Sequence, residues 1–234
     1  MMSISVRPQH YYGKTLLGLC ILAIIFLLPS SAASQRRIIG GVSAQSDAWP
    51  WMAAIVDAGG DLYADQYCGG TLIHSRWVMT AAHCVYDNYG ELVDPEDIEV
   101  VLGVTNLRKD TVERIAVDNI VVHPNYDHHK SNDADIALLE LETESLQEPI
   151  AVFSGESDLS GKDSMVIGWG VTGFSSPSPS QLQQASVPIV SNTVCNDAYT
   201  RSSLYHNPPI TSGMMCAGFA SGSRDTCFGD SGGP

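Results

Sequence analysis

The stretch that decides the fold reads GDSGGP and runs from Gly229 to Pro234. It places Ser231 among three glycines, and a glycine backbone can approach a substrate closely because no side chain intervenes. A serine hydroxyl is a weak nucleophile until a general base takes its proton, and that base needs a buried carboxylate to hold its tautomer. Ser231 is therefore a candidate nucleophile if the chain also supplies a histidine and an aspartate.

Two other stretches supply those groups. TAAHC (80–84) places His83 directly after an apolar run. NDADIALL (132–139) places Asp135 where another apolar run begins, a position that would bury its carboxylate. Asp133 lies two residues earlier and is the alternative for the same role. Each stretch is weak evidence by itself, because a histidine after a strand is usually structural and an aspartate before a strand is usually a turn residue.

Taken in the order His, Asp and Ser, these stretches resemble the chymotrypsin–trypsin family of serine endopeptidases. The resemblance runs from Arg37 to Pro234 and includes, in family order, the motifs IIGG, CGGTLI, TAAHC, DIALL, GWG, MMCAG and GDSGGP. Coincidence at all seven is negligible. The resemblance implies a trypsin-like protease with an all-β fold of two antiparallel six-stranded β-barrels. Residues 38–145 would form the first barrel, and the remainder an incomplete second one.

The strand pattern along the chain agrees with that fold class. Short β-branched or aromatic runs alternate with turn residues, as in antiparallel sandwiches and barrels. The helix expected in this series spans residues 191–199, with Ser191 or Asn192 as its N-cap. The predicted strands span residues 51–56, 71–74, 77–81, 98–103, 114–123, 135–141, 165–170 and 185–190.

The resemblance also implies a role for individual residues. Ser231 is the nucleophile, His83 is the general base and then the general acid, and Asp135 orients His83. The backbone N–H groups of Gly229 and Ser231 form the oxyanion hole, where loss of one donor costs roughly 10²–10³ in turnover. A glycine suits position 229 because a side chain there would crowd the developing oxyanion.

Asp225 lies six residues before Ser231, at the base of the primary specificity pocket in this family. A buried carboxylate is costly without a partner, so it selects a substrate that brings its own cation. The resemblance therefore implies cleavage after Arg or Lys. The alternatives are that Asp225 is an exposed loop residue and that the specificity is chymotrypsin-like.

The stretch RRIIGG resembles a zymogen activation site. Cleavage after Arg37 would free the α-amino group of Ile38, which has a reference pKa of about 8 and is mostly protonated at neutral pH. By resemblance, this ammonium pairs with Asp230 and shapes both the oxyanion hole and the specificity pocket. The arginine pair at positions 36 and 37 suits a trypsin-like activator or self-activation.

The amino-terminal residues follow the order of a secretory signal. Arg7 and Lys14 precede an apolar run over residues 16–28, and small residues follow it. The run is shorter than the roughly 18–20 residues that a spanning helix needs, which leaves a signal anchor as the alternative. We expect secretion and three segments: a signal peptide over residues 1–33, an activation propeptide over 34–37 and the protease domain over 38–234.

The charge excludes some partner classes. The net charge is −14, and residues 1–37 hold four of the twelve basic residues but none of the 26 acidic ones, so the remainder carries −18. Such a surface argues against binding to nucleic acid or to an anionic membrane. It favours approach of cationic substrates, with a surface tuned for solubility as the alternative.

Five cysteines remain after Cys20 leaves with the signal, which is an odd number for an exported chain. It leaves open intermolecular pairing, a free thiol or a partner outside this sequence. By resemblance, the pairs are Cys68 with Cys84 and Cys195 with Cys216, each bond contributing roughly 2–4 kcal/mol. The family partner of Cys227 would lie beyond residue 234.

In this family roughly a fifth of the catalytic domain follows GDSGGP. Together with Cys227, this predicts that the chain is a C-terminally truncated fragment, because a second barrel without its last strands would expose unpaired edges. A naturally short protein is the alternative.

No cofactor or metal is expected, because the stretch over residues 104–110 lacks the well-placed acidic ligands of the family's calcium loop, and Asp110 alone does not replace them. The expected partners are protein or peptide substrates that contain Arg or Lys, an activating protease and protein inhibitors, and the expected state is a monomer. The rival function is a non-catalytic, protease-like binding module or an inactive fragment. The presence of all three triad residues argues against the binding module.

Overall fold

The computed structural model describes residues 41–109, 112–128, 133–155, 158–172, 176–201, 210–222, 226 and 228–234. Several predicted features lie outside the described residues: the signal peptide, the propeptide with Arg37, and the residues Ile38, Asp225 and Cys227. Within the described residues, no helix has the length and apolar character needed to cross a bilayer.

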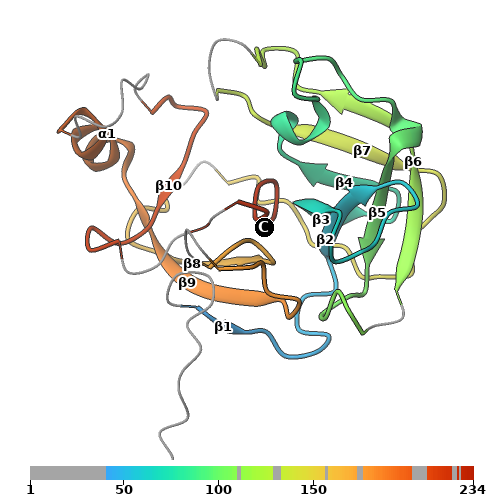
Figure 1. Ribbon diagram of the computed structural model, residues 1–234. Helices are drawn as coiled ribbons and strands as arrows, with labels where there is room; N and C mark the ends of the chain where they lie inside the picture. Colours follow the sequence, from blue (N-terminus) through green and yellow to red (C-terminus); the bar gives the residue numbers. More distant parts are fainter. Residues whose placement is uncertain are drawn as a thin grey trace, which may run out of the picture. The chain divides into compact units, whose positions relative to one another are not determined.

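Six strands close into an antiparallel barrel in the order β2-β3-β4-β7-β6-β5 (Figure 1). This confirms the expected all-β class and the first six-stranded barrel. The strands are β2 (Met52–Asp57), β3 (Gln66–His74), β4 (Trp77–Thr80), β5 (Ile98–Leu102), β6 (Glu113–Val122) and β7 (Ala137–Leu141).

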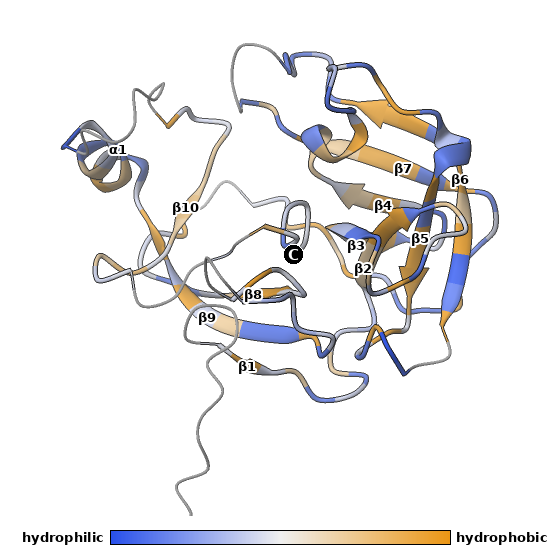
Figure 2. Cartoon of the chain, in the orientation of Figure 1, coloured by the Kyte–Doolittle hydropathy of each residue, from blue (hydrophilic) through white to orange (hydrophobic). Residues whose placement is uncertain are grey.

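The barrel forms because its strands carry apolar side chains toward a common interior. In β7 the buried residues Ala137, Leu139 and Leu141 alternate with the half-buried Leu138 and Glu140. This is the two-residue period of a strand with one face in a core. Figure 2 shows the barrel strands largely in the hydrophobic colours, with hydrophilic colours on many of the connecting loops.

A second sheet is built around β9 (Gln183–Val190), which pairs antiparallel with three other strands. Within the described part of the chain this sheet has four strands, which fits the expected second, incomplete barrel. The partners of β9 are β1 (Val42–Ser43), β8 (Asp163–Gly168) and β10 (Cys216–Ala217).

The expectation that residues 38–145 all belong to the first barrel is wrong at its start. Val42 and Ser43 pair with Gln184 and Gln183 of β9, and the Ala44 N–H donates to the Leu182 carbonyl at 2.8 Å. The closed barrel has no free strand edge with which this segment could pair. Strand β9 pairs with β8 along one edge, and its opposite edge is open to Val42 and Ser43. The segment after residue 40 therefore joins the second sheet.

The helix α1 (Asn192–Arg201) lies where the sequence predicts one. The Ser191 hydroxyl accepts a hydrogen bond from the Val194 N–H at 3.4 Å, which makes Ser191 the N-cap. Cys195 of α1 is joined to Cys216 of β10 by a disulfide. This bond ties the helix to the second sheet.

Candidate active site

His83 and Asp135 come together because the strands that precede and follow them are paired. His83 lies on the 3₁₀ helix η1 (Ala82–Val85), directly after β4, and Asp135 lies just before β7. Thr80 at the end of β4 pairs with Ala137 at the start of β7. The β4–β7 ladder therefore brings the segments that follow β4 and precede β7 to one end of the barrel.

The Asp135 carboxylate accepts two hydrogen bonds from His83. Its Oδ2 lies 2.7 Å from the ring Nδ1, and its Oδ1 accepts the His83 backbone N–H at 2.8 Å. Because an ionised carboxylate can only accept, Nδ1 carries the proton. A neutral His83 then has its lone pair on Nε2, which is the form a general base requires.

The electrostatics keep the two groups in complementary states. The hydrogen bond to Asp135 raises the pKa of His83 above its ordinary value, against the opposing effect of partial burial. Burial alone would raise the pKa of Asp135, but the hydrogen bonds from the His83 ring and backbone outweigh it and lower that pKa. Asp135 therefore stays ionised while His83 can accept a proton.

Asp133, the alternative partner, makes different contacts. Its Oδ1 accepts the Thr211 hydroxyl at 2.8 Å and the Ala134 N–H at 3.0 Å. The contacts of the two aspartates favour Asp135 as the carboxylate that orients His83.

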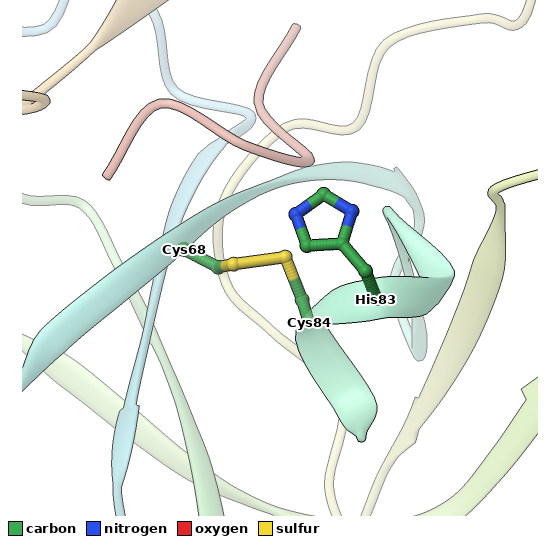
Figure 3. Close-up of side chains that lie close together, drawn as sticks. All are labelled: Cys68, His83 and Cys84. Atoms are coloured by element: carbon green, nitrogen blue, oxygen red, sulfur yellow. A yellow bond between two sulfur atoms is a disulfide. The ribbon is translucent and has the colours of Figure 1, made fainter. Parts of the chain in front are cut away.

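A disulfide braces the histidine. Cys68 of β3 is bonded to Cys84, the residue after His83, and Figure 3 shows the imidazole beside this bond. The two sulfurs and one ring nitrogen lie within 4.8 Å of one another. Metal binding by cysteine needs a thiolate, and in a disulfide both sulfurs are already bonded. We therefore assign the two cysteines a structural role.

Ser231 is anchored beside this cluster through its backbone. Its carbonyl accepts the Gly69 N–H at 2.7 Å and lies 3.7 Å from the Cys84 sulfur. No hydrogen bond joins the hydroxyl of Ser231 to the ring of His83, both of which the structure describes. Such contacts are often long without substrate and tighten in the Michaelis complex.

The loop around Ser231 explains several glycines of the motifs. Gly232 has φ of +79°, and a Cβ there would overlap the Thr80 hydroxyl and lie 2.7 Å from the Gly69 carbonyl. On the other side, a Cβ on Gly168 or Gly170 would overlap the Asp230 carboxyl group. Only glycine allows these segments to pack so closely.

Asp230 is only 7% exposed, and its Oδ1 accepts the Gly170 N–H at 2.7 Å. The Val171 N–H donates to the Phe228 carbonyl at 2.9 Å, and the Ile167 N–H donates to the Pro234 carbonyl at 3.2 Å. The loop over residues 228–234 is thus held by β8 and the residues after it as well as by the barrel.

An open hollow of about 520 Å³ adjoins Ser231. Asp225, the predicted specificity residue, lies outside the described residues, but the next residue in the chain, Thr226, lines this hollow. The described lining consists of Thr226, Phe228, Asp230, Ser231, Gly232 and Gly233.

One residue that contacts the loop around Ser231 cannot be identified from any sequence motif. The Gln66 side chain donates to the Gly229 carbonyl at 2.9 Å, across 163 residues of chain. No sequence pattern around a glutamine at the start of a strand predicts a hydrogen-bond partner so far away in the chain.

Known serine proteases are similar in sequence to this chain. Residues 38–234 match the family model for trypsin. The chain is 34% identical over 226 residues to serine protease filzig of Drosophila melanogaster, covering 90% of this chain and 13% of that protein. It is 37% identical over 213 residues to the proclotting enzyme of Tachypleus tridentatus, covering 86% and 55% of the two chains.

A third relative is transmembrane protease serine 11G of Rattus norvegicus, 36% identical over 203 residues, with 85% of this chain and 45% of the relative covered. The chain therefore spans between 13% and 55% of the length of these three relatives.

The hydrogen bond from Asp135 predicts a measurable property of His83. Replacing Asp135→Asn removes the charge that stabilises the imidazolium, so the pKa of His83 should fall. An NMR titration of the His83 ring in a Ser231→Ala background measures it. Asp118→Asn removes an exposed carboxylate near Arg76 and serves as the control, with no change expected at His83. An unchanged or higher His83 pKa in Asp135→Asn would contradict the assignment.

Proposed function

The chain belongs to the trypsin family of serine proteases, and we propose that it is the zymogen of a secreted endopeptidase that cleaves after Arg or Lys. The observation that carries the proposal is the doubly hydrogen-bonded His83–Asp135 pair beside the anchored backbone of Ser231. This arrangement suits acyl transfer, because it supplies a nucleophile, a general base and a carboxylate that stabilises the protonated base.

In the proposed reaction, the Ser231 hydroxyl oxygen attacks the scissile carbonyl while His83 Nε2 takes the hydroxyl proton. Asp135 stabilises the imidazolium, and the N–H groups of Gly229 and Ser231 donate to the oxyanion. Collapse of the tetrahedral intermediate breaks the peptide bond, and His83 gives its proton to the leaving amine. Water then hydrolyses the acyl-enzyme by the same steps, and Ser231 is restored.

Specificity for Arg or Lys rests on Asp225. A carboxylate at the base of a pocket is costly unless the substrate supplies a cation. The excess of acidic over basic residues also favours approach of cationic substrates.

Activation rests on Ile38 and Asp230. Asp230 is buried and accepts a neutral N–H from Gly170, so a cationic α-amino group would add a charge-assisted hydrogen bond at that carboxylate. Because the loop from Gly229 to Ser231 contains Asp230, this new bond would act directly on the oxyanion hole. We propose that cleavage after Arg37 activates the protein in this way.

A fluorophosphonate probe tests the activity. After cleavage at Arg37, the protein should be labelled at Ser231, because only a serine activated by a base attacks the probe at a useful rate. Ser231→Ala should not be labelled, whereas Ser154→Ala, which removes an exposed hydroxyl, should be labelled like the wild type. Failure of the cleaved wild type to react would instead support a protease-like binding module or an inactive fragment.

Ester substrates test the specificity. The wild type should hydrolyse an Arg ester in preference to a Phe ester, and Asp225→Ser should lower kcat/KM for the Arg ester by roughly 10²–10³, as expected for loss of a desolvated charge partner. Asp158→Ser removes an exposed carboxylate and should leave kcat/KM unchanged. A wild type that prefers the Phe ester would show chymotrypsin-like specificity and contradict the proposal.

A further inference from the structure

We propose that Gln66 is a positioning residue that fixes the peptide group after Gly229 and thereby holds the oxyanion hole in its working geometry. This inference rests on the proposed function, because it concerns the same two backbone donors. Gln66 lies outside all seven family motifs.

Gln66 begins β3 and is half-buried. Its Nε2 donates to the Cys68 carbonyl of its own strand at 3.0 Å and to the Gly229 carbonyl at 2.9 Å. A primary amide has two N–H donors, and each of them has one of these acceptors. The side chain is therefore fixed to the barrel at one bond and holds the nucleophile loop with the other.

Gly229 is the residue of this loop that most needs such a bond. Its φ of +93° lies in a region that glycine adopts freely, so its own conformational preference does little to fix the peptide planes on either side. The plane before it carries the Gly229 N–H and is held by the bond between the Val171 N–H and the Phe228 carbonyl, at 2.9 Å. The plane after it carries the Gly229 carbonyl, which is held by Gln66.

The next two residues are anchored differently. The Asp230 carboxylate accepts the Gly170 N–H at 2.7 Å, and the Ser231 carbonyl accepts the Gly69 N–H at 2.7 Å. Those anchors involve backbone groups or Asp230, which is assigned to activation. Gln66 can be replaced without changing any group proposed to touch the substrate.

Loss of the Gln66 donor should affect the transition state more than the ground state. Without it, the peptide between Gly229 and Asp230 can rotate, and the Gly229 and Ser231 N–H groups lose their common alignment. An oxyanion hole works through donors placed 2.7–3.1 Å from the position that the oxyanion will occupy. An interaction used only in the transition state changes kcat and leaves KM nearly unaltered.

The experiment compares Gln66→Met and Gln66→Glu in the full chain after cleavage at Arg37. Gln66→Met keeps the length of the side chain but has no donor, and Gln66→Glu places a carboxylate against two carbonyl oxygens. Gln181→Met is the matched control. It also removes a hydrogen bond from a glutamine side chain to a backbone carbonyl, here from the Gln181 Nε2 to the Ala44 carbonyl at 3.2 Å. The readouts are kcat and KM for an Arg peptide amide, the affinity for an Arg peptidyl aldehyde and the thermal midpoint.

We expect Gln66→Met to lower kcat about tenfold with little change in KM, the effect of one lost hydrogen bond of ordinary strength. Affinity for the aldehyde, which forms a tetrahedral adduct with Ser231, should fall in parallel. Gln66→Glu should lose more than Gln66→Met. Gln181→Met should keep kcat and aldehyde affinity, even if its thermal midpoint falls.

Two results would overturn the inference in distinguishable ways. An active wild type with unchanged kcat in Gln66→Met, or with losses that follow the thermal midpoint as in Gln181→Met, would show that Gln66 is only structural. A cleaved wild type without hydrolytic activity would overturn the proposed function, and this inference with it.

Discussion

The site depends on one carboxylate that accepts two hydrogen bonds from the same residue. Asp135 binds both the ring and the backbone N–H of His83, at 2.7 Å and 2.8 Å. The ring bond sets the tautomer, and the backbone bond sets the position of η1 relative to the start of β7. Both bonds require that β4 and β7 are neighbours, so the closed barrel is a condition for the chemistry as well as for stability.

A second constraint is the close approach of backbone segments around Ser231. The loop touches β3 through Gly69 and the segment after β8 through Gly170, and side chains at Gly168, Gly170 or Gly232 would overlap their neighbours. The motifs GWG and GDSGGP therefore need glycine at these positions, because each motif supplies part of a surface against which the other packs. The loop around Ser231 therefore derives its shape from both sheets.

Much of this arrangement can be predicted from the sequence. The strands of the barrel follow from short β-branched or aromatic runs between turn residues, and His83 and Asp135 follow from the motifs that surround them. The pairing of Val42–Ser43 with β9 could not be predicted, because two residues carry no periodicity. The contact of Gln66 with Gly229 cannot be predicted from the sequence, because only the tertiary fold brings these two residues together. The roles of Ile38 and Asp225 remain predictions from resemblance, since both lie outside the described residues.

The central claim is that Ser231 and His83 act in one active site, and a reagent that reacts with both residues tests it most directly. An Arg peptidyl chloromethyl ketone adds to a nucleophilic serine as a hemiketal and then alkylates a histidine within reach, and peptide mapping identifies the alkylated residue. For the protein cleaved at Arg37, we predict alkylation at His83 that is lost in Ser231→Ala. Alkylation at another histidine, or alkylation of His83 that is as fast in Ser231→Ala as in the wild type, would contradict a shared active site.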